Sequence, residues 1–220
     1  MTSLKIPEII PIFPLPETVL LPSEVLPLHI FEPRYRQMVR DALSGARIIG
    51  MTRLQPGYEN SYEGAPEINP VGCAGVIAQH QVLPDGRYLI VLVGVQKFQV
   101  AEELPRATLY RQFRVEHRPE QSSTQEKASL QNLRLELVSD LPPVLQRIRG
   151  ESIAPADLAR LDDNQLVAVA CQILQLNSDE KQRVLESESL SDRYLLLHEA
   201  LELLRMAGGG GAPVDPGQLN

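Results

Sequence analysis

Residues 71–101, VGCAGVIAQHQVLPDGRYLIVLVGVQKFQVA, hold the pattern that decides the fold. Two apolar runs, residues 71–82 and 87–94, flank Leu83-Pro84-Asp85-Gly86. Asp-Gly between apolar runs indicates a β-hairpin, because these residues tolerate the positive φ angles of a tight turn. Gly94 inside the second run predicts a bulge or a sharp bend, with a further strand over residues 95–101. The stretch therefore predicts an antiparallel sheet.

Toward the N-terminus the sequence predicts two more strands. Residues 8–16, EIIPIFPLP, are apolar but contain three prolines, which cannot donate to a sheet ladder. This segment is expected to be an edge strand or an extended crossing, not a central strand. Leu26, Leu28 and Ile30 then alternate with other side chains at the period of two that is typical of a strand.

One helix interrupts these strands. Pro33 follows Glu32, and proline is favoured at the first position of a helix. Apolar side chains then recur at helical spacing, which predicts a helix over residues 33–43. Strands are also expected at residues 47–54 and 110–117, and a long loop at residues 55–70. Several short strands with one inserted helix suggest a compact, partly closed antiparallel barrel.

The second half of the chain predicts helices. After a polar linker at residues 118–125, leucines recur at helical spacing, and Pro142-Pro143 should break or kink this helix. Further helices are expected over residues 165–176, from Ser178, and over residues 191–207. We therefore expect an α+β chain: a β-rich part at residues 1–120, a helical bundle at residues 121–207, and a disordered Gly/Pro tail at residues 208–220.

Composition narrows the function classes. The chain has 220 residues and a formal net charge of -7. Residues 121–220 carry nine Lys or Arg against 15 Asp or Glu, so nearly all of the charge lies there. This acidity argues against a general nucleic-acid binder. A signal sequence and a membrane span are not expected, and two distant cysteines do not form a disulfide framework, so a cytoplasmic location is the simplest expectation.

Motifs for catalysis or cofactor binding are missing from the sequence. It contains no P-loop and no dinucleotide fingerprint. His198 begins half of a zincin-like pattern, but Glu202 stands where the second His should be, so a solvent-facing His is expected. Cys171 lies in an apolar run and is expected to be an inert buried thiol. We expect no catalytic, metal or cofactor-binding residues. A small hydrolase with an unrecognised Cys or Ser stays open, because such partners meet in space rather than in sequence.

Two arginine clusters favour a minority hypothesis. Each cluster is interleaved with Glu or Asp, so surface ion pairs are the main expectation. A local anion or RNA site is the alternative, since a near-neutral domain can still carry a basic patch. The clusters consist of Arg34, Arg36 and Arg40, and of Arg106, Arg111, Arg114 and Arg118.

Several motifs in order resemble one family. PIFPLPETVLLP at residues 11–22 runs into LPLHIFEPRY at residues 26–35, and LPDGR follows at residues 83–87. VGVQKF at residues 93–98 is similar to a G-x-x-R-F segment, with Lys97 in place of Arg, and EKQRVLE stands at residues 180–186. Together they resemble the N-terminal substrate-binding domain of the Lon protease family, over roughly residues 8–207.

The resemblance implies a PUA-like β pseudobarrel followed by a helical bundle. It also implies a stand-alone protein similar to that domain, without the family's ATPase and Ser/Lys peptidase, so neither activity is carried over. The leading hypothesis is a non-enzymatic recognition module that binds exposed apolar peptide segments or a protein partner, with a separate protease as one candidate. RNA binding by the PUA-like barrel and hydrolysis are the alternatives.

Candidate contact residues come from the apolar and aromatic positions of this region. They are expected in a groove where barrel and helices meet, edged by the 55–70 loop, although core or edge packing is the commoner role of such side chains. The sequence leaves the partner, the groove and the oligomeric state open. The candidates are Phe13, Leu15, His29, Phe31 and Tyr58.

Overall fold

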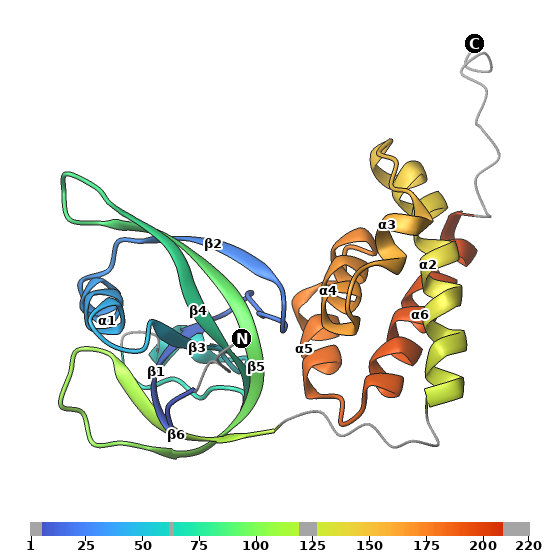
Figure 1. Cartoon of the computed structure of the whole chain (residues 1–220). Coiled ribbons are helices and arrows are strands. Elements are labelled where there is room, and N and C mark those ends of the chain that lie inside the picture. Colours follow the sequence, from blue (N-terminus) through green and yellow to red (C-terminus); the bar gives the residue numbers. More distant parts are fainter. Residues whose placement is uncertain (1–5, 62–63, 119–126, 209–220) are drawn as a thin grey trace, which may run out of the picture.

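The computed structural model describes residues 6–61, 64–118 and 127–208. Its strands form one lobe with the first helix, and the remaining helices form a second lobe beside it (Figure 1). All six strands precede residue 118, and the second lobe begins at residue 127. A division near residue 120 and a disordered tail stay predictions, since residues 119–126 and 209–220 lie outside the described residues.

The six strands form one mixed sheet in the order β2-β5-β4-β3-β1-β6. β6 also pairs with the far end of β5, so five strands close into an irregular ring and β2 is left outside it. The α+β class is confirmed. A purely antiparallel barrel is wrong, because β1 and β3 run parallel. The strands are β1 (Ile9–Leu15), β2 (Val25–Ile30), β3 (Ile48–Arg53), β4 (Val71–Val82), β5 (Tyr88–Glu103) and β6 (Arg111–His117).

The proline-rich strand β1 lies inside the sheet, so its predicted edge position is wrong. Its first half pairs with β6 and its second half with β3, and only Ile12 pairs on both sides. Pro11 falls in the first half and Pro14 in the second. Each proline nitrogen can therefore face a side without a neighbour, which is how a proline is tolerated in a strand.

The predicted hairpin is confirmed. In the turn between β4 and β5, Gly86 N–H donates to the Leu83 carbonyl at 2.9 Å and Leu83 N–H donates to the Arg87 carbonyl at 2.8 Å, and Gly86 has a φ of 80°. A register shift lies opposite Gly94, so the predicted bulge is confirmed, although β5 continues through it as one strand. The close approach of another segment explains the glycine: an added Cβ on Gly94 would lie 2.0 Å from the Leu21 carbonyl oxygen.

Helix α1 (Pro33–Leu43) spans the predicted residues, with proline in its first turn. Its buried residues are those that the helical spacing placed on one face, Tyr35, Met38, Val39 and Ala42. A separate cluster of buried hydrophobic side chains has members on all five strands of the ring. We infer that it fills the inside of the ring. Its members include Ile10, Ile12, Ile48, Ala74, Phe98 and Phe113.

Five helices make up the second lobe. Capping boxes at Asp162 and Asn177 start two of them. α2 runs uninterrupted through Pro142-Pro143, so a predicted break is wrong; its buried face, which includes Leu141 and Val144, packs against the other helices. The helices are α2 (Lys127–Arg149), α3 (Pro155–Ala159), α4 (Asp163–Ile173), α5 (Ser178–Glu186) and α6 (Leu190–Gly208). None of the helices in the described ranges has the length and apolarity to cross a membrane.

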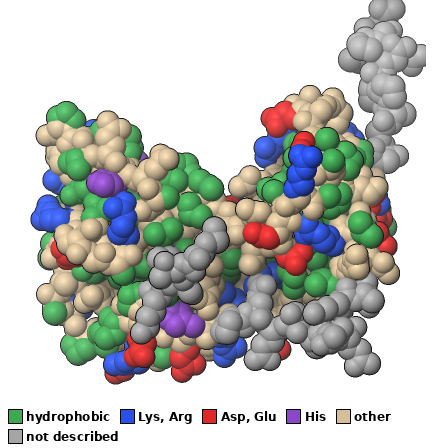
Figure 2. Space-filling view, viewed as in Figure 1, with side chains coloured by type: hydrophobic (Ala, Val, Ile, Leu, Met, Phe, Trp, Pro, Cys, Tyr) green, Lys and Arg blue, Asp and Glu red, His purple; other side chains and the backbone are tan. Residues whose placement is uncertain are grey.

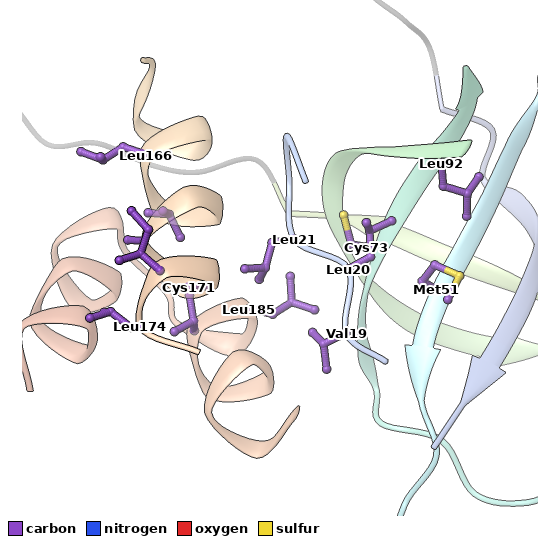
Figure 3. Close-up of a cluster of buried hydrophobic side chains, with 14 of the residues drawn as sticks. Val19, Leu20, Leu21, Met51, Cys73, Leu92, Leu166, Cys171, Leu174 and Leu185 are labelled. Atoms are coloured by element: carbon purple, nitrogen blue, oxygen red, sulfur yellow. The ribbon is translucent and has the colours of Figure 1, made fainter. Parts of the chain in front are cut away.

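An extended segment, residues 19–24, fills the junction of the two lobes. Val19, Leu20 and Leu21 are buried between the sheet and helices α4 and α5, and Leu21 lies beside Leu185 (Figure 3). The backbone of this segment is held to the bulge, since Ser23 N–H donates to the Gly94 carbonyl at 2.8 Å. One continuous apolar core therefore joins sheet and helices.

Polar contacts cross the same junction. The Lys181 ammonium lies 2.6 Å from the buried Glu24 carboxylate, whose second oxygen accepts from the Leu21 N–H at 2.9 Å. Lys97 Nζ donates to the Ser187 carbonyl at 2.6 Å, and the Gln182 amide donates to the Val71 carbonyl at 3.1 Å. Such buried, paired groups fix the relative position of the two lobes.

Candidate functional site

The outer face of strands β2, β5 and β4 is exposed and largely apolar. Strand alternation turns Leu26, Leu28 and Ile30 toward the core, so the residues between them point outward. The cross-strand pairs Pro27–Val91 and His29–Leu89 extend this outward row onto β5. We call the following set the outer sheet face: Val25, Pro27, His29, Phe31, Gln79, Gln81, Leu89, Val91 and Val93.

Apolar exposure on this face is high. Val25 is 56% exposed, Phe31 60% and Leu89 41%. The rings of His29 and Phe31 lie 5.9 Å apart. The face is shallowly hollowed around Pro27, His29 and Leu89, with a volume of about 560 Å³. It carries no Lys, Arg, Asp or Glu among its named residues, so it suits an uncharged, extended ligand.

The outer sheet face lies beside a larger hollow. Figure 2 shows the molecule notched between the two lobes, and β2 follows the border of this notch in Figure 1. The floor of the notch is not an open groove, because residues 19–24 fill it. Space for a ligand is therefore found on the flank of the sheet rather than where sheet and helices touch.

The structure brings together two of the five predicted contact residues. His29 and Phe31 lie side by side on the outer sheet face. Phe13 is buried in the core, with its ring 4.3 Å from that of Tyr35, and Leu15 is partly buried against the same core. Tyr58 lies half-buried in a short 3-10 turn (Tyr58–Ser61) of the 55–70 loop.

Sequence reasoning missed the β5 members of the face. Leu89, Val91 and Val93 belong to the run YLIVLV, which is apolar at every position and therefore reads as a strand buried on both sides. The polar residues Gln79 and Gln81 on the neighbouring strand were the available signal. They indicate that one side of this hairpin faces water.

Both cysteines are unsuited to nucleophilic chemistry. Cys73 and Cys171 are fully buried. Burial raises the pKa of each thiol to about 12, because the thiolate is poorly solvated in an apolar core. The expected inert role of Cys171 agrees with this position.

We expect neither thiol to react with iodoacetamide in the native protein at pH 8. At a pKa of about 12 only about one thiol in ten thousand is ionised at that pH, and the core excludes the reagent. Mass spectrometry should find both sites modified only after unfolding in urea. Rapid modification of the native protein would show that a thiol is accessible to the reagent. It would then support the alternative of a hydrolase with a cysteine nucleophile.

His198 was expected to face solvent, but the structure shows that it is partly buried. Its ring nitrogen Nε2 lies 2.9 Å from the Leu133 carbonyl oxygen, so it ties α6 to α2. Within residues 6–61, 64–118 and 127–208, no group of three or more His, Cys, Asp or Glu side chains is arranged to hold a metal ion.

Three of the seven clustered arginines, Arg34, Arg111 and Arg114, form ion pairs within the described residues. Arg34 lies 2.8 Å from Glu32, and Arg111 bonds both carboxylate oxygens of Glu103 at 2.8 and 2.7 Å. The Arg111 guanidinium lowers the pKa of Glu103 through these bonds, with Arg106 adding to the effect. For these three arginines the pairing agrees with the expected ion pairs. An anion or RNA site that uses the other members of the clusters stays a hypothesis.

Residues 9–203 match the family described as the ATP-dependent protease La (LON) substrate-binding domain. The chain belongs to this family. The match runs from β1 into α6, so sheet, junction segment and helices together form the family's unit.

The chain is similar to several curated Lon proteases. The chain is 27% identical over 208 residues to the Lon protease of Dictyoglomus thermophilum, covering 92% of this chain and 26% of that protein. It is 29% identical over 195 residues to Lon protease 2 of Desulfotalea psychrophila, covering 88% of this chain and 25% of that protein. The chain thus spans about a quarter of the length of the curated relatives that it matches.

Solved structures share the fold. The N-terminal domain of the Mycobacterium avium complex Lon protease matches with a TM-score of 0.70 at 18% identity, covering 88% of this chain and 98% of that one. A Lon N-terminal domain protein from Xanthomonas campestris matches with a TM-score of 0.60 at 21% identity, covering 87% of this chain and 97% of that one. The predicted Lon-N fold is confirmed by these likenesses.

Proposed function

We propose that this chain is a non-enzymatic recognition module that binds extended apolar segments of protein substrates in connection with proteolysis. The observation that carries the proposal is the outer sheet face, which exposes Val25, Phe31 and Leu89 and has no charged side chain among its named residues. Membership of a substrate-binding family supports a recognition role, and the likeness covers only that part of the Lon relatives.

Side-chain packing, rather than strand addition, carries the proposed binding. Over the described residues, β2 pairs only with β5, which leaves its other edge open. Pro27 in the middle of that strand lacks an N–H, so a continuous ladder with an added strand would be interrupted. An extended peptide is instead expected to lie across the face, with alternate side chains over His29, Phe31 and Leu89.

The expected affinity is modest. Burying about 400 Å² of apolar surface contributes roughly 10 kcal/mol at ~25 cal/mol/Å², and much of this is offset by the ordering of the peptide. Binding is therefore expected in the micromolar range, which suits a module that samples many segments.

Leu89→Asp is expected to weaken binding of a fluorescein-labelled, uncharged apolar peptide about tenfold. The substitution removes an apolar contact and places a charge in the centre of the face, where a bound peptide would desolvate it. Fluorescence anisotropy titrations give the affinity directly. The matched control is Leu135→Asp, since Leu135 is 58% exposed on α2, away from the sheet.

Three results would contradict this assignment. They are equal weakening by the two variants, an unchanged affinity in Leu89→Asp, and absence of any enrichment for apolar segments on a peptide array. Circular dichroism of each variant shows that the fold is retained, so a loss of binding can be assigned to the face.

A further inference from the structure

A second surface, separate from the outer sheet face, lies between helices α5 and α6. A small cleft there has apolar walls, formed by Leu176 and Val184 on one side and by Leu196, Ala200 and Leu203 on the other. The two helices are joined directly, since α5 ends at Glu186 and α6 begins at Leu190. They therefore form a helical hairpin with a groove along its open side.

The groove continues beyond this cleft. A shallow hollow of about 500 Å³ next to it shares Arg183, Leu196 and Glu199 with the cleft and reaches Leu195. Leu195 is 54% exposed and Leu203 59%. Leu196, Ala200 and Leu203 recur three to four positions apart, so they lie on one side of α6, along the groove. Leu196 and Ala200 also pack partly against the core, whereas Leu195 and Leu203 stay exposed.

The rim of this α5–α6 groove is strongly acidic. Five carboxylates line it, against one cation, Arg183. Arg183 lies 3.8 Å from Glu199, and the Glu180 and Asp192 carboxylates accept backbone N–H bonds at the starts of their helices. These bonds leave the excess negative charge in place. The five are Glu180, Glu186, Glu188, Asp192 and Glu199.

We propose that the α5–α6 groove binds a cationic amphipathic α-helix of a protein partner. A helix laid along a helical hairpin places residues spaced three and four apart into the groove, where Leu195, Leu196 and Leu203 would contact them. Lys and Arg on the flanks of that helix would lie over the carboxylates of the rim. From Asp192 to Leu203 the groove follows about 16 Å of α6, which matches about three turns of a bound helix.

The charge of the two surfaces assigns them different ligands. The outer sheet face has no charged side chain among its named residues and follows extended strands, so it suits an extended neutral segment. The groove lies between two helices and has an acidic rim, so it selects by charge as well as by apolarity. The excess negative charge that the sequence places in residues 121–220 thus gains a role beyond solubility.

A designed peptide tests the proposal on the full chain. The probe is an amphipathic helix of about 14 residues with leucines spaced three and four apart and lysines on its flanks. A matched peptide carries glutamates in place of the lysines. Isothermal titration calorimetry is expected to show binding of the lysine peptide only, weakening about tenfold between about 50 and about 300 mM NaCl.

Variants of the rim locate the binding. Glu188→Lys is expected to weaken binding of the lysine peptide about tenfold, because it replaces attraction by repulsion at the groove. Leu195→Ser should weaken it about fivefold by removing an exposed apolar contact. Glu151→Lys is the control, since it makes the same charge change at an exposed position that does not line the groove.

Four outcomes would overturn the proposal. They are no binding of the lysine peptide at millimolar concentration, equal binding of the glutamate peptide, equal weakening by Glu188→Lys and Glu151→Lys, and a dimer of the chain that Leu195→Ser dissociates while the peptide does not bind. Retention of apolar-peptide binding by Glu188→Lys would show that the outer sheet face works independently.

Discussion

Replacing Gly94 with alanine is expected to lower the free energy of unfolding by about 3 kcal/mol. An ideal Cβ on this residue would lie 2.0 Å from the Leu21 carbonyl oxygen and 2.9 Å from its carbonyl carbon. These are backbone atoms, which cannot rotate away as the end of a side chain can. Either β5 or residues 19–24 must therefore move.

A displacement of β5 or of residues 19–24 would weaken several contacts at once. Gly94 N–H donates to the Glu24 carbonyl at 2.9 Å, and the Gly94 carbonyl accepts from Ser23 N–H at 2.8 Å. Both hydrogen bonds hold residues 19–24 in the junction, where Leu20 and Leu21 are buried. A displaced segment would loosen the packing between sheet and helices as well as the bulge.

Thermal and urea unfolding followed by circular dichroism measure the effect. A loss of about 3 kcal/mol should lower the melting temperature by roughly 6–12 °C in a chain of this size. Gly45→Ala is the control, because its Cβ would meet neighbours only at an ordinary 3.6 Å. An unchanged melting temperature for Gly94→Ala would mean that residues 19–24 do not pack against the bulge as described.

The second large effect is expected from Lys181→Met, at about 3 kcal/mol of stability. Lys181 Nζ lies 2.6 Å from Glu24, whose side chain is only 6% exposed. Removing the lysine leaves a buried carboxylate with its remaining bond to Leu21 N–H. An uncompensated buried charge costs more than the pair contributes when both partners are present.

A double-mutant cycle measures the interaction energy between Glu24 and Lys181 separately from their contacts with other residues. Glu24→Gln combined with Lys181→Met should be less destabilising than the sum of the two single changes, because the double variant buries no isolated charge. Arg114→Gln is the control: this side chain is half exposed and lies 3.5 Å from Glu8 and 3.7 Å from Glu102, so its loss should cost under about 0.5 kcal/mol. Additive losses across the cycle would contradict a direct contact between Glu24 and Lys181.

Local patterns predicted much of the fold. The Asp85-Gly86 turn and the helix at residues 33–43 both depend on neighbours within a few positions. The order of motifs also identified the family. Where prediction failed, a distant element decided the outcome: β1 lies inside the sheet because its two halves have different partners.

The surfaces for binding were much harder to predict. Of the five candidate residues, His29 and Phe31 lie on the outer sheet face, whereas Phe13 belongs to the core. All are apolar or aromatic positions in similar local patterns. Whether such a side chain is covered depends on which element packs over it, and this is not encoded by its neighbours in sequence.

The sequence by itself determined the hairpin, the inserted helix, the helical second half with most of the net charge, and the family. Each rests on local backbone preference, periodicity or motif order, which a single chain segment carries. Only the tertiary structure decided that residues 19–24 close the junction of the lobes, that one face of β2 and β5 stays exposed, and that the acids of α5 and α6 surround an apolar groove. Those features depend on which surfaces bury one another, and burial is a property of the packed chain.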